Sequence, residues 1–142
     1  MTAATARWKR VLAVRSIQRQ MAEVQLNRCE AELRNLVGLG DRISSIRHAA
    51  QPSAGDHDGM MLHAICELSS RLDSAQSALA TPNQNAKAAR DRQQRAVTAA
   101  KQRETAVEKL EISLLAQDAK NADARQGRTA IFRKPIKTGG VI

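Results

Sequence analysis

Aromatic side chains are nearly absent from this chain. Its 142 residues include one Trp, one Phe and no Tyr, together with only 3 Pro and 7 Gly. Globular cores of this size usually use several aromatics, because each one buries a large area. Ala, Gln, Arg, Lys, Glu and Leu are prominent instead, which is the composition of long helices and coiled coils. The sequence therefore predicts one elongated all-α unit rather than a compact domain.

The chain also lacks the patterns of secreted and membrane-spanning proteins. Its two cysteines, Cys29 and Cys66, do not suggest a disulfide scaffold. No apolar run approaches the ~20 residues of a membrane span, and the N-terminal stretch has no apolar signal-peptide core. We therefore expect a cytoplasmic protein, or one exported by a route that needs no cleaved signal.

Catalytic and ligand-binding motifs are missing as well. No GxSxG, Walker or dinucleotide-binding loop occurs. A zinc site could use His57, His63 and Cys66, but their spacing matches neither paired cysteines nor HExxH. Polar residues exposed near a turn are the simpler interpretation. We expect no enzymatic activity, no cofactor and no metal site.

Charge is distributed unevenly along the chain. The net charge is +9, from 23 basic and 14 acidic residues. Residues 1–51 carry a net +5, residues 52–85 a net −3, residues 86–126 a net +3 and residues 127–142 a net +4. The middle is thus acidic between two basic ends. A basic surface suggests nucleic acid, anionic lipid or an acidic protein as partner.

One strong turn divides the helical pattern into a hairpin. Residues about 7–50 and about 60–126 favour helix, and residues about 51–59 form a dense cluster of breakers and turn formers. Residues 127–142 are basic and broken by Pro and Gly, so a flexible tail is predicted. The sequence therefore predicts a long antiparallel two-helix coiled-coil hairpin followed by a tail.

Three local features interrupt the arms. Gly38 and Gly40 each weaken a helix by roughly 1 kcal/mol relative to Ala, which predicts a soft spot. Pro82 would either kink one long helix, or stand at the first position of a new helix that Thr81 caps. We prefer a kink or short break, because no glycine or loop-length segment accompanies the proline.

Apolar stripes at helical spacing run along both arms. The first arm has two, joined by a shift that resembles a stutter: Val14, Ile17, Met21 and Val24, then Ala22, Leu26, Cys29, Leu33, Leu36, Ile43 and Ala50. The second arm has Met61, Ile65, Leu68, Leu72, Ala75 and Leu79, followed by Val97, Ala100, Val107, Leu110 and Leu114. We predict that the stripe from Met61 to Leu79 packs on the first arm and is the best-packed part of the hairpin.

The turn predicts how the arms align. If it centres near Ala54 or Gly55, the numbers of facing residues add to about 109, which places Trp8 opposite Lys101. The second arm would then overhang the first from Gln102 onward. Cys29 and Cys66 would miss each other by roughly 20 Å along the axis, too far for a disulfide. Both are then small hydrophobic residues of the seam.

The region around the turn has more large apolar residues than two helices can bury. Either a third element covers the surplus, or it is exposed for a partner. We assign Ile43, Ile65 and Leu68 to the core. Leu39, Ile46 and Met60 fit a core position and a contact patch equally well.

The basic start of the chain allows several functions. Arg7, Lys9, Arg10 and Arg15 surround Trp8 and an apolar stretch, which suits a membrane surface, the end of a coiled coil, or docking into a protein ring or groove. Nucleic-acid binding is less favoured, because acidic residues are interleaved with the basic ones and stacking aromatics are lacking. The basic tail still allows a weak electrostatic interaction with nucleic acid.

A short basic hairpin of this kind resembles the central stalk proteins of type III secretion, flagellar FliJ and the YscO-type proteins of injectisomes. The resemblance covers residues 7–126 and rests on length, unequal arms, basic ends and composition. It includes the opening Arg7-Trp8-Lys9-Arg10 before Val11-Leu12-Ala13-Val14-Arg15. No aromatic residue stands where the family's gate-contact surface has tyrosines and phenylalanine.

The resemblance implies a non-enzymatic stalk that inserts into the ring of a hexameric secretion ATPase and contacts the cytoplasmic domain of the export gate. Some family members also bind secretion chaperones. The gate, or another partner, would contact Asn35, Leu39, Arg42, Ile46 and Met60. The ring end would comprise Arg7, Trp8, Arg10, Arg125 and Arg128. The alternative is a generic coiled-coil adaptor or secretion chaperone.

Overall fold

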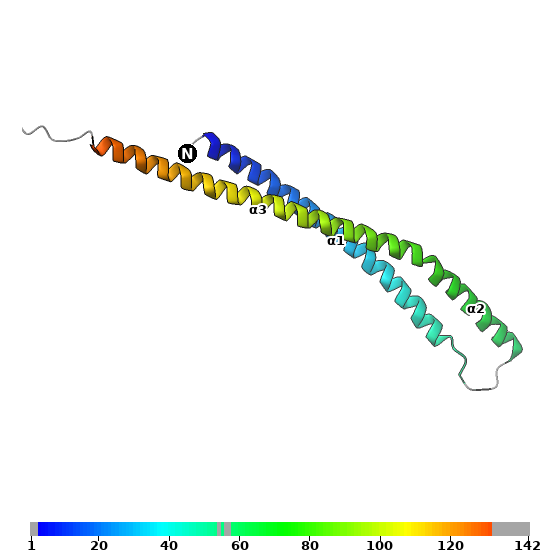
Figure 1. Ribbon diagram of the computed structural model, residues 1–142. Helices are drawn as coiled ribbons and strands as arrows, with labels where there is room; N and C mark the ends of the chain where they lie inside the picture. The colour runs from blue at the N-terminus through cyan, green and yellow to red at the C-terminus, as the bar shows by residue number, and fades with distance from the viewer. Residues whose placement is uncertain (1–2, 54, 56–57, 132–142) are drawn as a thin grey trace, which may run out of the picture. The chain divides into compact units, whose positions relative to one another are not determined.

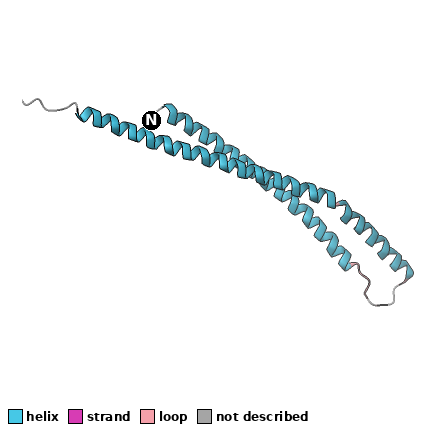
Figure 2. Cartoon of the chain, viewed as in Figure 1, coloured by secondary structure: helices cyan, strands magenta, loops and turns pink. Residues whose placement is uncertain are grey.

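Three helices account for almost all of the computed structural model, which describes residues 3–53, 55 and 58–131. Helix α1 spans Ala3–Ala49, α2 spans Gly59–Ala78 and α3 spans Ala80–Ile131 (Figure 1). No strand occurs among these residues (Figure 2). The predicted all-α fold class is therefore confirmed.

The chain divides into two compact units, each with its own pair of helical segments. The terminal unit comprises Met1–Ile17 and Lys101–Ile142, and the turn unit comprises residues 18–100. In the turn unit, α1 runs antiparallel to α2 and the start of α3, so this unit is a helical hairpin (Figure 1). In the terminal unit, the start of α1 runs antiparallel to the rest of α3.

The second arm bends at Leu79, between α2 and α3. Pro82 lies three residues later, and it has no N–H to donate to the Ala78 carbonyl. Helical bonding continues around the bend, since the Leu79 N–H donates to the Ala75 oxygen and the Asn83 N–H to the Leu79 oxygen at 3.0 Å. The expected kink or short break near Pro82 is confirmed as a bend, and its centre lies just before the proline.

Two helix boundaries differ from the predicted ones. Helix α1 begins at Ala3 and passes through Gly38 and Gly40 without ending. Helix α3 continues past Gly127 to Ile131, because one glycine costs a helix only about 1 kcal/mol. The tail predicted from residue 127 thus begins within α3, and its remainder, 132–142, lies outside the described residues.

The alignment of the arms differs from the prediction. In the turn unit, Arg47 forms an ion pair with Asp73 and donates a hydrogen bond of 3.3 Å to Gln76. In the terminal unit, Thr5 lines one cavity with Asp118 and Ala122. In each unit, the residue numbers of two facing positions therefore add to about 122 rather than 109. Trp8 faces the region near Leu114, so the predicted overhang from Gln102 is wrong.

The unequal ends of the two helices at the turn explain this difference. Asp73 faces the last turn of α1, so the first part of α2 extends beyond Ala49. Pro52 lines the same groove as Cys66 and Ser69 of α2. Because α2 begins well before the position that faces Ala49, the register is shifted from the one that a symmetric turn would give.

A regular heptad seam holds the turn unit together. One set of buried and half-buried residues recurs at steps of 3 and 4, the spacing of a and d positions in a coiled coil, with a single gap at the exposed Gln76. On α1 they are Arg19, Ala22, Leu26, Cys29, Leu33, Leu36, Gly40 and Ile43. On α2 and α3 they are Ile65, Ser69, Leu72, Leu79, Asn83, Ala86, Arg90, Gln93, Val97 and Ala100. The second predicted stripe of the first arm is thus confirmed over Ala22–Ile43.

The first predicted stripe of that arm is not part of the seam. Its members, Val14, Ile17, Met21 and Val24, are 49–65% exposed. In the terminal unit the half-buried residues at seam spacing are instead Trp8, Leu12 and Arg15. Arg15 can occupy such a position because the aliphatic stem of an arginine can pack against apolar neighbours. No stutter is therefore needed.

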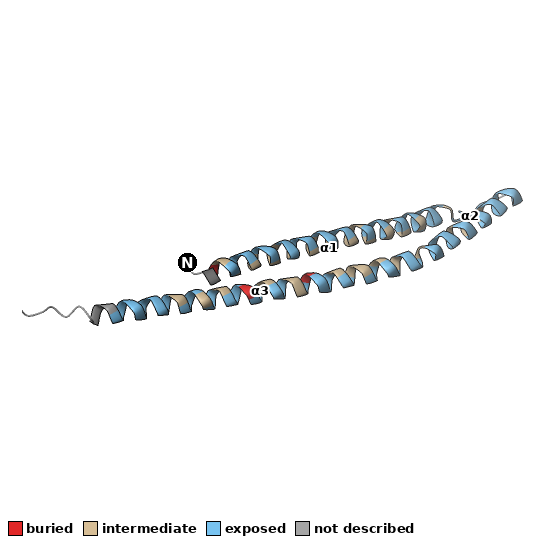
Figure 3. Cartoon of the chain, turned by 90° about the horizontal axis from the view of Figure 1, so that it is seen from above, coloured by how far each residue is buried: buried red, intermediate tan, exposed pale blue. Residues whose placement is uncertain are grey.

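The best-packed apolar residues lie in α3, not in α2. Val97 is 4% exposed and Val107 is 9% exposed, whereas α2 has no buried residue (Figure 3). The prediction that the stripe from Met61 to Leu79 is the best-packed part is wrong. Only half of that stripe lies on the seam, and Leu68, which we assigned to the core, is 40% exposed.

Candidate partner-binding surfaces

One face of the turn unit carries exposed apolar residues on both arms. In an antiparallel pair, the g positions of both helices border the same side of the seam. These positions hold Leu39 and Ile46 on α1, and Met61, Leu68 and Ala75 on α2. The four larger side chains are 40–54% exposed. We call the g positions of the turn unit and the c positions outside them the g face.

The g face brings together four of the five predicted residues near the turn. Leu39 and Ile46 occupy g positions, and Asn35 and Arg42 occupy the neighbouring c positions; all four are exposed. Asn35, Leu39 and Arg42, together with Arg34, also surround a hollow of about 300 Å³ above Gly38, which has no side chain to fill it. Met60 is 81% exposed but lies on the outer side of α2, away from these four.

The sequence did not reveal that Met61, Leu68 and Ala75 belong to this face. They alternate with Ile65, Leu72 and Leu79 at steps of 3 and 4, so the six residues resemble a single seam. The structure places Ser69 among the half-buried residues instead, and exposes Met61, Leu68 and Ala75. Only the register of α1 against α2 could have separated the two sets.

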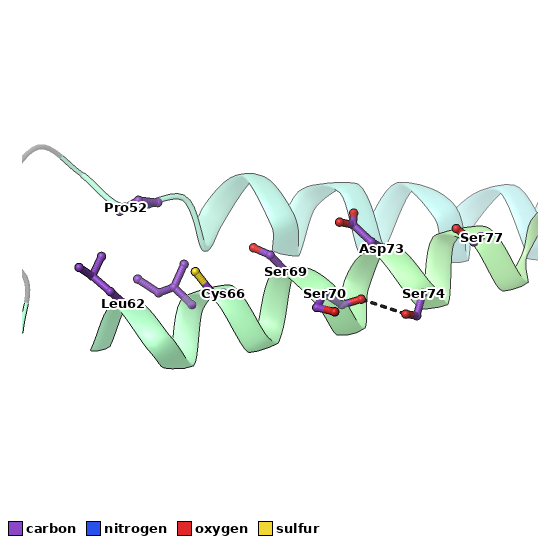
Figure 4. Close-up of a pocket in the computed structure, with 9 residues that line it drawn as sticks. Pro52, Leu62, Cys66, Ser69, Ser70, Asp73, Ser74 and Ser77 are labelled. Carbon is purple, nitrogen blue, oxygen red and sulfur yellow. Dashed lines mark hydrogen bonds between the residues drawn. The ribbon is translucent and has the colours of Figure 1, made fainter. Parts of the chain in front are cut away.

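The opposite side of α2 forms an open groove of about 860 Å³. Its lining combines apolar residues and serines with one carboxylate: Pro52, Leu62, Ile65, Cys66, Ser69, Ser70, Asp73, Ser74 and Ser77 (Figure 4). Asp73 is engaged by Arg47, and the Ser74 hydroxyl donates to the Ser70 carbonyl at 3.0 Å. Asp73 and the Ser74 hydroxyl thus already have partners within the chain.

The predicted ring-end residues all lie in the terminal unit. Arg7 and Arg10 are exposed, and Trp8 is half-buried on the seam. Arg125 lines a cavity of about 450 Å³ with Thr5, which is only 1% exposed, while Arg128 is exposed one turn further along α3. By its sequence, this unit carries 13 basic and 5 acidic residues, a net +8.

Some expectations concern small clusters of residues. Of the residues considered for a zinc site, His57 lies outside the described residues. Among the residues that the structure describes, no group of three His, Cys, Asp or Glu side chains is arranged to hold a metal. Cys29 is half-buried on the seam and Cys66 is exposed, and neither forms a disulfide. The absence of a Cys29–Cys66 bond is as predicted, but the assignment of Cys66 to the seam is wrong.

None of the described helices combines the length and the apolar character needed to cross a membrane. Comparison of the chain with models of protein families, with curated proteins and with solved structures finds no match.

Proposed function

We propose that the protein is a non-enzymatic coiled-coil stalk or adaptor of a bacterial type III secretion or flagellar export apparatus. It would insert its basic end into the ring of the hexameric secretion ATPase, and its other end would contact the cytoplasmic domain of the export gate. In this role it is cytoplasmic and peripheral to the membrane-embedded apparatus, and it works by docking rather than by chemistry.

The observation that carries a docking role is the exposure of large apolar residues outside the seam. Leu39, Ile46, Met61 and Leu68 are 40–54% exposed on one face of the turn unit. They follow one another along this face at helical spacing, and exposed apolar surface bordered by polar residues marks interaction sites in soluble proteins. The resemblance of the basic opening and the unequal arms to the stalk proteins supports the narrower role.

The unequal lengths of the two arms also support the comparison with the stalk proteins, although the arms align differently from the prediction. Helices α2 and α3 together have 72 residues against 47 in α1, so the second arm is longer by 25, as predicted. The altered register divides this excess between the two ends of α1. The part of α3 that remains beyond Thr5 is therefore short, and a ring-inserting end would use both helices.

A binding experiment tests the proposal. The hexameric ATPase and the export-gate domain encoded in the same genome would be purified, and binding and ATP hydrolysis measured with and without this protein. We expect binding to both and faster hydrolysis. The substitution pair Arg7→Glu and Arg10→Glu should weaken only ATPase binding, and Leu39→Asp with Ile46→Asp only gate binding.

The result also separates this proposal from its alternative. Val37→Asp is a matched control, because Val37 is 47% exposed on the other side of the seam. Binding to a secretion chaperone or another helical protein, with no effect on the ATPase, would favour a generic coiled-coil adaptor. Failure to bind both the ATPase and the gate would contradict the stalk proposal.

A further inference from the structure

Charges in the turn unit are sorted between its two faces. On the g face, the charged residues are four arginines at c positions and one glutamate at a g position: Arg28, Arg42, Arg71, Arg92 and Glu32. The opposite face, made of the e and b positions, carries five acidic residues, Glu23, Glu30, Asp41, Asp73 and Asp91, and two basic ones, Arg34 and Lys87. One face therefore has a net +3 and the other a net −3. A solvated coiled-coil exterior more often alternates its charges.

An uncharged line runs between the arginine edges. On α2 and α3 the consecutive g positions are Met61, Leu68, Ala75, Pro82, Ala89 and Ala96, and the g positions of α1 add Leu39 and Ile46. At 1.5 Å per residue, the line from Met61 to Ala96 is roughly 50 Å long. Large side chains stand near the turn and small ones further along, where a third helix could approach closely.

The arginines at the edges are available for a partner. Arg28, Arg42 and Arg92 are exposed and form no hydrogen bond or ion pair with the described side chains. Arg71 pairs with Glu67 one turn away on the same helix, and its side chain is 76% exposed. Such exposed pairs within one helix contribute little to stability, so Arg71 can exchange its partner at small cost.

We propose that the g face binds an amphipathic helix whose apolar stripe is bordered by aspartates and glutamates. The apolar stripe of that helix would lie along the g positions of α2–α3. It would complete a three-helix bundle where α1 is present, and it would contact α2 alone at Met61 and Leu68. Its carboxylates would meet the arginines on both edges. The inference rests on the proposed function in one respect, namely that Leu39, Arg42 and Ile46 belong to a surface that binds a partner protein. It adds the chemistry of the partner.

Other occupants fit the face less well. In a symmetric dimer the face would meet itself, so its arginine edges would lie against arginine edges and repel. A nucleic acid would satisfy the arginines but would leave the apolar line against a phosphate backbone. An acidic amphipathic helix satisfies both features together.

Designed peptides provide a direct test on the full chain. One peptide of about 28 residues would have Leu at a and d and Glu at e and g, and a matched peptide would have Lys in place of Glu. We expect the acidic peptide to bind about tenfold more tightly than the basic one, from several weak edge contacts added together. The preference should shrink as salt is raised, because the edge charges are exposed.

Variants with matched controls locate the binding. Arg28→Glu, Arg42→Glu and Arg92→Glu combined should reverse the preference between the two peptides. Leu39→Asp with Leu68→Asp should abolish binding of the acidic peptide. Lys87→Glu and Val37→Asp, which lie on the opposite face of the turn unit, should leave both affinities unchanged. Circular dichroism would confirm that each variant keeps its helix content.

Several results would overturn the inference. These are equal affinity for the two peptides, binding of neither, or loss of binding in Val37→Asp but not in Leu68→Asp. Self-association in sedimentation that Leu68→Asp removes would instead assign the face to a second copy. Heparin binding that needs the arginines but ignores Leu39 and Leu68 would assign it to a polyanion. The peptides contain no part of a secretion apparatus. If they fail to bind, the inference about the g face is wrong, while the stalk proposal is still decided by the ATPase and gate measurements.

Discussion

Helix α2 and the part of α3 around Val97 belong to the same unit but differ in an unexpected way. Helix α2 carries large apolar residues from Met60 to Leu72, and none is buried. The stretch around Val97 is rich in alanine and polar residues, yet it buries that valine to 4% exposure. A long segment of α1 faces Val97, whereas the first part of α2 extends beyond the end of α1. Burial thus depends on the opposing helix as much as on apolar content.

The largest expected effect tests this contrast directly. Val97→Asp places a charge at a buried position without a partner, so we expect the free energy of unfolding to fall by about 3–5 kcal/mol. Leu68→Asp should change it by no more than about 0.5 kcal/mol, because Leu68 is exposed. Urea denaturation followed by circular dichroism measures both. Equal losses in the two variants would mean that α2 packs as tightly as α3.

A polar seam residue next to the bend gives the second test. The Oδ1 atom of Asn83 is buried and has no hydrogen-bond partner among the described residues. An unsatisfied buried polar group costs about 1–3 kcal/mol, so Asn83→Leu should stabilise the hairpin by about 1–2 kcal/mol. Thermal denaturation measures the change, with Asn85→Leu at an exposed position as control. A loss of stability would show that Asn83 contributes through its polar group.

The glycines of α1 give a smaller effect. A Cβ atom at Gly38 or at Gly40 would meet nothing within 4 Å. Each change to Ala should therefore stabilise the protein by up to about 1 kcal/mol, through the greater helix propensity of Ala. Urea denaturation of the single and double variants would show whether the two gains add. A destabilised Gly40→Ala variant would mean that the seam is tighter there than the structure shows.

The ion pair near the turn gives the smallest effect. Arg47 bonds to Asp73 and Gln76, but the Arg47 and Asp73 side chains are 44% and 54% exposed. We expect Arg47→Ala to cost no more than about 1 kcal/mol, and less in high salt. A double-mutant cycle with Asp73→Ala isolates the pair energy. An energy well above 1 kcal/mol would show that this contact sets the register.

The helices were predictable because local rules determine them. Strong helix formers continue from Arg7 to Ala50, a cluster of breakers marks the turn, and Pro82 explains the bend at Leu79. The register was not predictable in the same way. It depends on how far α2 extends beyond the end of α1, and no residue pattern specified that extension.

The candidate surface was predictable in part for the same reason. Asn35, Leu39, Arg42 and Ile46 lie on one helix, so their spacing was enough to group them. Met61 and Leu68 join them from another helix, and this required the register. The prediction that Val14 and Ile17 lie on the seam is wrong for a further reason. The half-buried residue at seam spacing there is Arg15, and a charged residue is not expected in an apolar stripe.

The two register contacts also have a consequence for the order of folding. Arg47 and Asp73 are 26 residues apart in the chain, whereas Thr5 and Asp118 are 113 apart. By loop-closure entropy alone, forming the second contact from an unfolded chain costs about 1.3 kcal/mol more than forming the first. We therefore expect the helices of the turn unit to pair first and those of the terminal unit to pair afterwards. Amides in the terminal unit should then exchange with solvent sooner, through openings that leave the turn unit folded.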